Sequence, residues 1–65
     1  MYAIRNRKTL KWVYGTDFGR FPHTQRTSED NVMIFETLDQ ARTEFKRRMC
    51  GTSYEIVPVR VEVLE

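Results

Sequence analysis

The sequence predicts a small α+β fold, an antiparallel sheet of order β-β-β-α-β with one helix packed on one face. Three observations favour this class. Two short runs near the N-terminus alternate between apolar and polar residues, a strong helix signal follows in the second half, and a valine-rich run comes last. With 65 residues, we expect a single compact domain over residues 1–65.

A β-hairpin is predicted at residues 2–14. Residues 2–6 and 12–14 are rich in strand formers, and the mostly polar link between them, residues 7–10, is short enough for a hairpin loop. Leu10 is a poor residue for this link, because a left-handed position there would favour glycine or asparagine.

The register of the hairpin has two alternatives, which differ by one residue and therefore exchange the two faces. If Asn6 pairs with Lys11, Ile4 and Val13 both point to the core. If Asn6 pairs with Trp12, the core face instead carries Tyr2, Ile4, Trp12 and Tyr14. We favour the second register, because a small domain with a single tryptophan normally buries most of it.

Residues 15–31 predict the longest irregular stretch, since they contain Gly19, Pro22 and the polar run "TQRTSEDN". Loops of this length in small domains tend to be functional or mobile. The short apolar run at residues 31–35 then predicts a third strand.

The clearest local signal is a helix over residues 38–50. Thr37 and Gln40 have the spacing of a capping box, and Gly51 is a suitable left-handed residue to end the helix. Apolar side chains at helical spacing form one stripe that we expect to bury against the sheet: Leu38, Ala41, Phe45 and Met49.

Residues 54–64 predict the last strand. Tyr54 and Ile56 have one parity along this run, whereas the valines from Val57 onward have the other. Pro58 lies at the change of parity, which predicts either a β-bulge there or an edge position for the strand.

We expect a protein without catalytic activity. Asp17-Phe18-Gly19 matches the metal-binding triplet of protein kinases, but the other kinase motifs are missing, so the triplet predicts a turn with a packed phenylalanine. His23 and Cys50 are the single histidine and the single cysteine, and they form no metal-ligand spacing. No metal, cofactor or disulfide is therefore expected.

The sequence favours a cytoplasmic location. No run approaches the roughly 18 apolar residues of a membrane span, and the N-terminal residues show no signal-peptide pattern. A lone cysteine also suits a reducing compartment. Both a monomer and a homodimer are consistent with so short a chain.

Positive charge is concentrated in the first 26 residues. They contain six lysine or arginine side chains against one carboxylate, whereas the whole chain has a net charge of +2. Cations interleaved with aromatic rings are typical of nucleic-acid surfaces, and aromatic and arginine residues also anchor protein interfaces. The predicted partner surface consists of Arg5, Arg7, Lys8, Lys11, Arg20, Phe21, His23 and Arg26.

Three pieces of the sequence carry a resemblance to a known group: "YAIRNRKTLKWVYGTD", "FETLDQARTEFKRR" and "YEIVPVRVEV". In these pieces the chain resembles small proteins encoded by phages and prophages of Gram-positive bacteria. That group includes inhibitors of bacterial immunity, type II anti-CRISPR proteins among them, which bind a nuclease and block its handling of nucleic acid. The resemblance implies a host protein as partner, in particular a CRISPR-Cas nuclease of the Cas9 type or its guide-RNA complex, in the bacterial cytosol.

A second resemblance rests on "KWVYG" and "FETLDQA". These pieces are similar to a strand and to the start of the helix in AP2-like and integrase N-terminal domains, in which three strands and a helix bind DNA through the sheet. The leading expectation is a non-enzymatic, phage-derived inhibitor of a host defence protein. The alternative is a small nucleic-acid-binding module with a basic, aromatic hairpin surface.

Overall fold

The computed structural model describes residues 1–60, which form a four-stranded antiparallel sheet and one α-helix. The strands are β1 (Tyr2–Asn6), β2 (Trp12–Asp17), β3 (Thr24–Ser28) and β4 (Tyr54–Pro58). The helix α1 (Leu38–Arg47) and a short 3₁₀ helix, η1 (Gly51–Ser53), lie between β3 and β4 in the chain. The strand order is β3-β2-β1-β4, and the predicted α+β class is confirmed.

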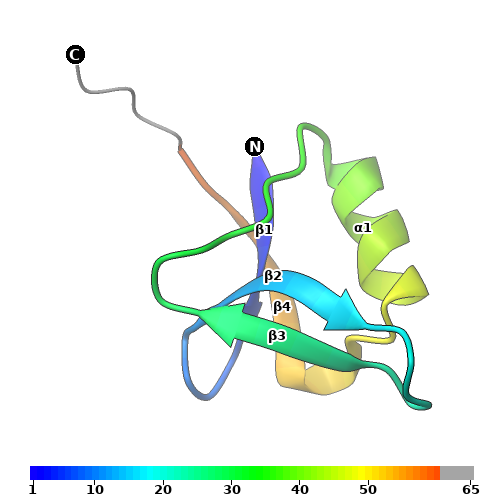
Figure 1. The fold of residues 1–65 in the computed structure, drawn as a ribbon. Helices are drawn as coiled ribbons and strands as arrows, with labels where there is room; N and C mark the ends of the chain where they lie inside the picture. Colours follow the sequence, from blue (N-terminus) through cyan, green and yellow to red (C-terminus); the bar gives the residue numbers. More distant parts are fainter. Residues whose placement is uncertain (61–65) are drawn as a thin grey trace.

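The sheet is strongly twisted. Figure 1 shows the β2–β3 hairpin crossing the β1–β4 pair at a steep angle, with α1 beside the crossing. The helix packs against β1 and β4. The β2–β3 hairpin therefore extends beyond the helix and presents its far turn near the helix C-terminus.

The observed hairpin register is the first of the two alternatives. Arg5 of β1 lies opposite Trp12 of β2, and this register places the fully buried Ile4 and Val13 on the core face. The register that we favoured from the sequence was wrong. Trp12 is instead half-buried on the opposite face of the sheet, where the Arg5 guanidinium carbon lies 5.7 Å from the indole centroid.

The third strand is not where the sequence predicted it. β3 lies inside residues 15–31, which were predicted to be irregular, whereas residues 31–34 form no strand. Every side chain of β3 is polar, so the strand has no apolar alternation that a sequence pattern could detect. A register shift between Val13 and Gly15 leaves Tyr14 as a bulge in the β2–β3 ladder.

Residues 31–35 bridge the gap between β1 and β2 instead. The Met33 amide donates to the Val13 carbonyl at 3.1 Å, and Tyr2 and Phe35 exchange two backbone hydrogen bonds, each of 2.8 Å. Phe35 and Met33 close the core there, whereas Val32 and Ile34 are exposed. The apolar run therefore supplies alternate core residues without forming a strand.

The core lies between the sheet and α1. Its buried members and the half-buried side chains packed against them come from every strand except β3: Ile4, Val13, Phe35, Ala41, Cys50, Tyr2, Met33, Phe45, Tyr54 and Ile56. The polar hairpin end that contains β3 is thus held mainly by hydrogen bonds and ring contacts.

The helix begins as predicted. The Gln40 amide donates to the Thr37 hydroxyl at 3.1 Å, and the Gln40 side-chain oxygen accepts from the Glu36 amide at 3.1 Å. The capping box is confirmed, with its return bond made one residue earlier than the standard pattern.

The helix ends at Arg47, three residues before the predicted boundary. Met49 adopts a left-handed φ of 55°, its amide donates to the Lys46 carbonyl, and the Cys50 amide donates to the Phe45 carbonyl. These two bonds form a Schellman motif, so Met49 takes the place usually given to glycine. Its side chain is 41% exposed, so its assignment to the buried stripe was wrong.

β4 is an edge strand that pairs with β1 and ends at Pro58. This confirms the edge position as the explanation for the proline. The predicted continuation of the strand beyond residue 60 lies outside the described residues.

Candidate binding surface

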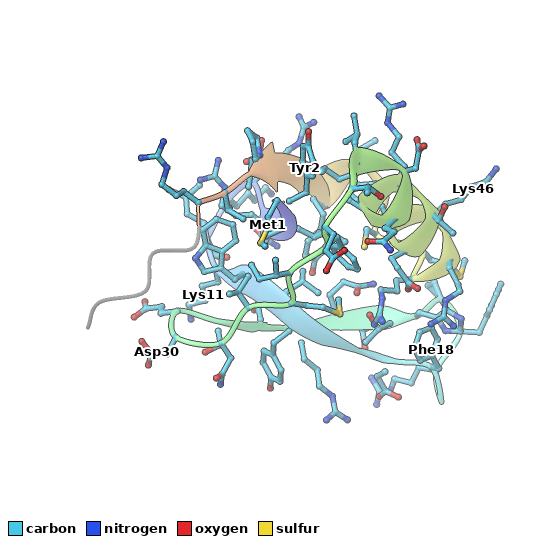
Figure 2. All side chains as sticks on the ribbon, turned by 90° about the horizontal axis from the view of Figure 1, so that it is seen from above. Met1, Tyr2, Lys11, Phe18, Asp30 and Lys46 are labelled. Atoms are coloured by element: carbon cyan, nitrogen blue, oxygen red, sulfur yellow. The ribbon has the colours of Figure 1, made fainter. Side chains whose placement is uncertain are left out.

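The predicted partner surface is divided by the fold. Lys11 precedes β2 and Phe18 follows it, and the six residues of β2 between them span about 20 Å at 3.4 Å per residue. Figure 2 shows these two residues at opposite ends of the molecule, with Asp30 at the same end as Lys11. The cations of the sequence therefore fall into separate groups.

The first group is the hairpin tip, defined by Arg7, Lys8 and Lys11. The Asn6 side-chain oxygen accepts from the Lys8 amide at 2.8 Å and from the Thr9 amide at 3.0 Å, which fixes the turn. Leu10 adopts the left-handed conformation at φ 61°. Lys8 and Lys11 extend into water, while the Arg7 guanidinium donates to the Tyr54 carbonyl at 3.4 Å.

The second group is the turn between β2 and β3. The Asp17 side-chain oxygen accepts from the Gly19 amide at 3.0 Å. The ring nitrogen Nδ1 of His23 lies 2.7 Å from the Arg20 carbonyl oxygen and donates to it. Phe21 projects from this turn with 85% of its side chain exposed.

The rings of this turn form a chain of edge-to-face contacts. The centroids of Phe18 and His23 lie 5.0 Å apart at an interplanar angle of 73°, and those of Phe21 and His23 lie 6.2 Å apart at 83°. Such T-shaped contacts add to stability beyond the area that they bury. Phe21, the most exposed ring of the turn, thus lies against the His23 ring.

The C-terminal end of α1 joins the same surface. The guanidinium carbons of Arg47 and Arg48 lie 5.1 Å and 5.5 Å from the Phe18 centroid. We call the combined group the turn surface, and it consists of Phe18, Arg20, Phe21, His23 and Arg47. The sequence reasoning named Arg20, Phe21 and His23 but missed Arg47, which is more than 20 positions away.

Arg48 ties the helix end to both strands of the hairpin. Its guanidinium donates to the Thr16 hydroxyl at 2.9 Å, Thr16 donates to the Gln25 side-chain oxygen at 2.6 Å, and the Gln25 amide group donates to the Arg48 carbonyl. These bonds close a ring that spans α1, β2 and β3. We call this ring the Arg48 clasp.

The acidic groups near the turn surface are already occupied. The Glu44 carboxylate accepts from Arg48 at 2.9 Å and from Arg47 at 3.2 Å. Burial by itself raises the pKa of Glu44, but hydrogen bonds and charge from Arg47 and Arg48 outweigh it and lower the pKa below its usual range. Among residues 1–60, Arg20 and Lys46 have no ion-pair partner.

The two remaining predicted residues lie apart from both groups. Arg5 is held by Glu55, with an ion pair of 2.8 Å, and by its position over Trp12. Arg26 is exposed on β3, beside Gly15. Arg5 is therefore engaged in contacts within the sheet, while Arg26 is exposed to solvent.

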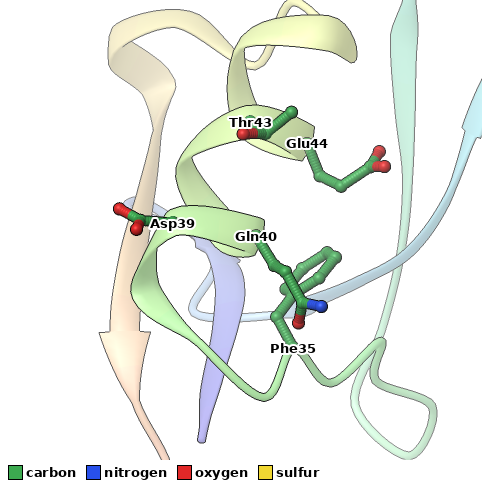
Figure 3. Close-up of a pocket in the computed structure, with 5 residues that line it drawn as sticks. All are labelled: Phe35, Asp39, Gln40, Thr43 and Glu44. Atoms are coloured by element: carbon green, nitrogen blue, oxygen red, sulfur yellow. The ribbon is translucent and has the colours of Figure 1, made fainter.

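Two hollows of the described surface are candidates for a catalytic site. Phe35, Asp39, Gln40, Thr43 and Glu44 line a hollow of about 460 Å³ beside α1, and Figure 3 shows the Asp39 and Glu44 carboxylates pointing away from each other. A second hollow of about 370 Å³ is lined by Trp12, Val32, Ile34, Val59 and Arg60. Diverging carboxylates in the first and a mainly apolar lining in the second offer no paired acid and base.

Cys50 is buried, and burial raises the pKa of its thiol to about 11 against the weaker opposing effect of Arg48. The thiol is therefore protonated at neutral pH and unreactive. Among residues 1–60, no three histidine, cysteine or carboxylate side chains gather as a metal site.

No family model, curated protein sequence or solved structure matches this chain. In the part of the chain that the structure describes, α1 is too short and too polar to cross a bilayer.

Proposed function

We propose that this protein is a non-enzymatic inhibitor that binds and blocks a host defence protein in the bacterial cytosol. A CRISPR-Cas nuclease is the specific case, as the resemblance to phage proteins implies. The turn surface is the main contact, and the hairpin tip and Arg26 add positive charge around it.

The observation that carries this proposal is the exposure of Phe21. A phenylalanine that is 85% exposed on a small domain loses the free energy that burial would give it, about 1.5–3 kcal/mol. Contact with a partner recovers that free energy. Exposed aromatic and arginine residues are also the side chains that contribute most at interfaces.

The charge around Phe21 restricts the partner. Arg20 has no ion-pair partner among the described residues, and Arg47 is more than half exposed. A partner face that is acidic, or that carries bound nucleic acid, complements these cations. A nuclease with its bound guide RNA has such a face.

The test is a pull-down from a bacterial host lysate with the tagged protein, with and without nuclease treatment. We expect a CRISPR-Cas nuclease to be recovered by the parent protein and lost with Phe21→Ala. Tyr14→Ala removes another exposed ring from the bulge in β2 and serves as the matched control, which should retain the partner.

A second pair of variants compares the two basic groups. Arg20→Glu should weaken inhibition strongly, and Lys8→Glu should weaken it less, while circular dichroism checks that both variants fold. Recovery of nucleic acid alone, or equal loss with both variants, would contradict the proposal.

A further inference from the structure

We infer that the direct ligand of the turn surface is a segment of single-stranded nucleic acid, with a base stacked on Phe21 and phosphates bound by Arg20 and Arg47. This inference rests on the proposed function, because it names the part of the partner that the surface contacts.

The ring geometry leaves stacking faces open. Phe18 and Phe21 each stand nearly perpendicular to His23, at 73° and 83°, so His23 does not stack on either ring. Phe18 already has two guanidinium groups over its ring, whereas Phe21 is exposed. Every base has a π face, so an open ring of this kind accepts a base of any sequence.

The charges suit a phosphate backbone. Glu44 is paired with two arginines, whereas Asp17 accepts a hydrogen bond from Gly19 and keeps its negative charge. Arg20 has no ion-pair partner among the described residues, and Arg47 lies over the Phe18 ring with more than half of its side chain exposed. Cations placed beside stacking rings are the combination that tracks single strands.

An exposed ring favours single strands over a duplex. Bases in a double helix are stacked on one another, so a side chain reaches their faces only by unstacking a base step and kinking the duplex, which costs free energy. Unpaired bases offer these faces without that cost.

The experiment titrates end-labelled 12-mers of dT, rU and dA, and a 12-base-pair duplex, with the purified full chain at two salt concentrations, using fluorescence anisotropy. We expect the single strands to bind more tightly than the duplex. The logarithm of the affinity should fall with the logarithm of salt with a slope of about −1.4, from two contacts at about −0.7 each.

Variants place the ligand on the surface. Phe21→Ala should lower the affinity for dT roughly 5- to 150-fold, the range measured for one stacked base, and Tyr14→Ala should leave it unchanged. Arg20→Ala should weaken binding and reduce the slope, whereas Lys8→Ala should change both much less. Circular dichroism checks that each variant folds.

Three results would overturn the inference: no binding of single strands at low salt, equal binding of the duplex, or competition by poly-glutamate at equal charge that matches competition by dT. If the oligonucleotides fail while the pull-down still recovers a nuclease that depends on Phe21, the proposed function stands and the ligand is a protein surface. If the oligonucleotides bind and no nuclease is recovered, the nucleic-acid ligand stands and the proposed inhibitor does not.

Discussion

The two turns of the β1–β2–β3 meander hold similar charges in different ways. At the hairpin tip, the side chain of Asn6 fixes the backbone, Lys8 and Lys11 extend into water, and Arg7 donates only to the Tyr54 carbonyl. At the other end, rings pack against rings, and the helix contributes guanidinium groups. A basic surface with a structured apolar centre can bind a partner specifically, whereas cations alone mainly attract one.

Ile4→Ala tests the part of the fold that both turns share, and it has the largest expected effect. Ile4 is fully buried in the core, so the change should cost about 2–5 kcal/mol. A chain of this size has a free energy of unfolding of about 3–10 kcal/mol, so most molecules should unfold. Urea unfolding followed by circular dichroism measures the loss. Leu10→Ala, at an exposed position of the hairpin tip, should behave like the parent protein.

Arg48→Met separates the two turns. It removes the guanidinium bonds to Glu44 and Thr16, which should cost about 1–3 kcal/mol. Hydrogen exchange should accelerate in residues 16–25 and stay unchanged at residues 7–11. Arg42→Met on the exposed side of α1 is the matched control. Equal acceleration at both turns would show that the Arg48 clasp does not hold the turn surface in particular.

Leu10→Gly and Met49→Gly compare the backbone strain of the two regions. Each residue has a left-handed φ, 61° and 55°, and an exposed side chain. Glycine adopts this conformation without steric cost, so each change should stabilise the protein by about 1 kcal/mol. The melting temperature should rise by several degrees in both variants. A lower melting temperature at either position would mean that side-chain contacts outweigh the strain there.

Acid should weaken the turn surface by a smaller amount. The folded-state pKa of Glu44 is lowered, so its contribution is present above the usual value of 4.5 and is lost as pH falls through the folded pKa. For a partly exposed pair the effect should stay under about 1 kcal/mol. Urea unfolding between pH 7 and pH 3 should show a smaller loss of stability in Glu44→Gln than in the parent protein.

Local signals in the sequence predicted the fold where they coincide with local structure. Thr37 and Gln40 predicted the start of α1, because a capping box is formed by neighbouring residues. β3 escaped detection because Gln25 and its neighbours are polar and are held by Thr16 and Arg48. The register was misjudged at Trp12, whose ring is covered by a cation and not by the core.

The candidate surface was likewise predicted only where its residues are close together in the sequence. Arg20, Phe21 and His23 are close in sequence, and composition was enough to predict them. Arg47 joins them through the Phe18 ring, a contact between residues 29 positions apart that the sequence pattern could not supply. Lysine and arginine at a helix C-terminus are favoured by the helix dipole in any protein. Their presence at the end of α1 therefore does not by itself indicate a binding role.

The pairing of β4 with β1 has a consequence for the way the chain folds. Arg5 and Glu55 meet across 50 positions of sequence, whereas β2 and β3 form a local hairpin. Closing so long a loop costs entropy before any contact repays it, so the hairpin and α1 are expected to form first and β4 to join last. During synthesis, β1 leaves the ribosome several seconds before its partner at about 5–20 residues per second. Over that interval the apolar side chains of β1 lack their strand partner, so a chaperone has time to bind them.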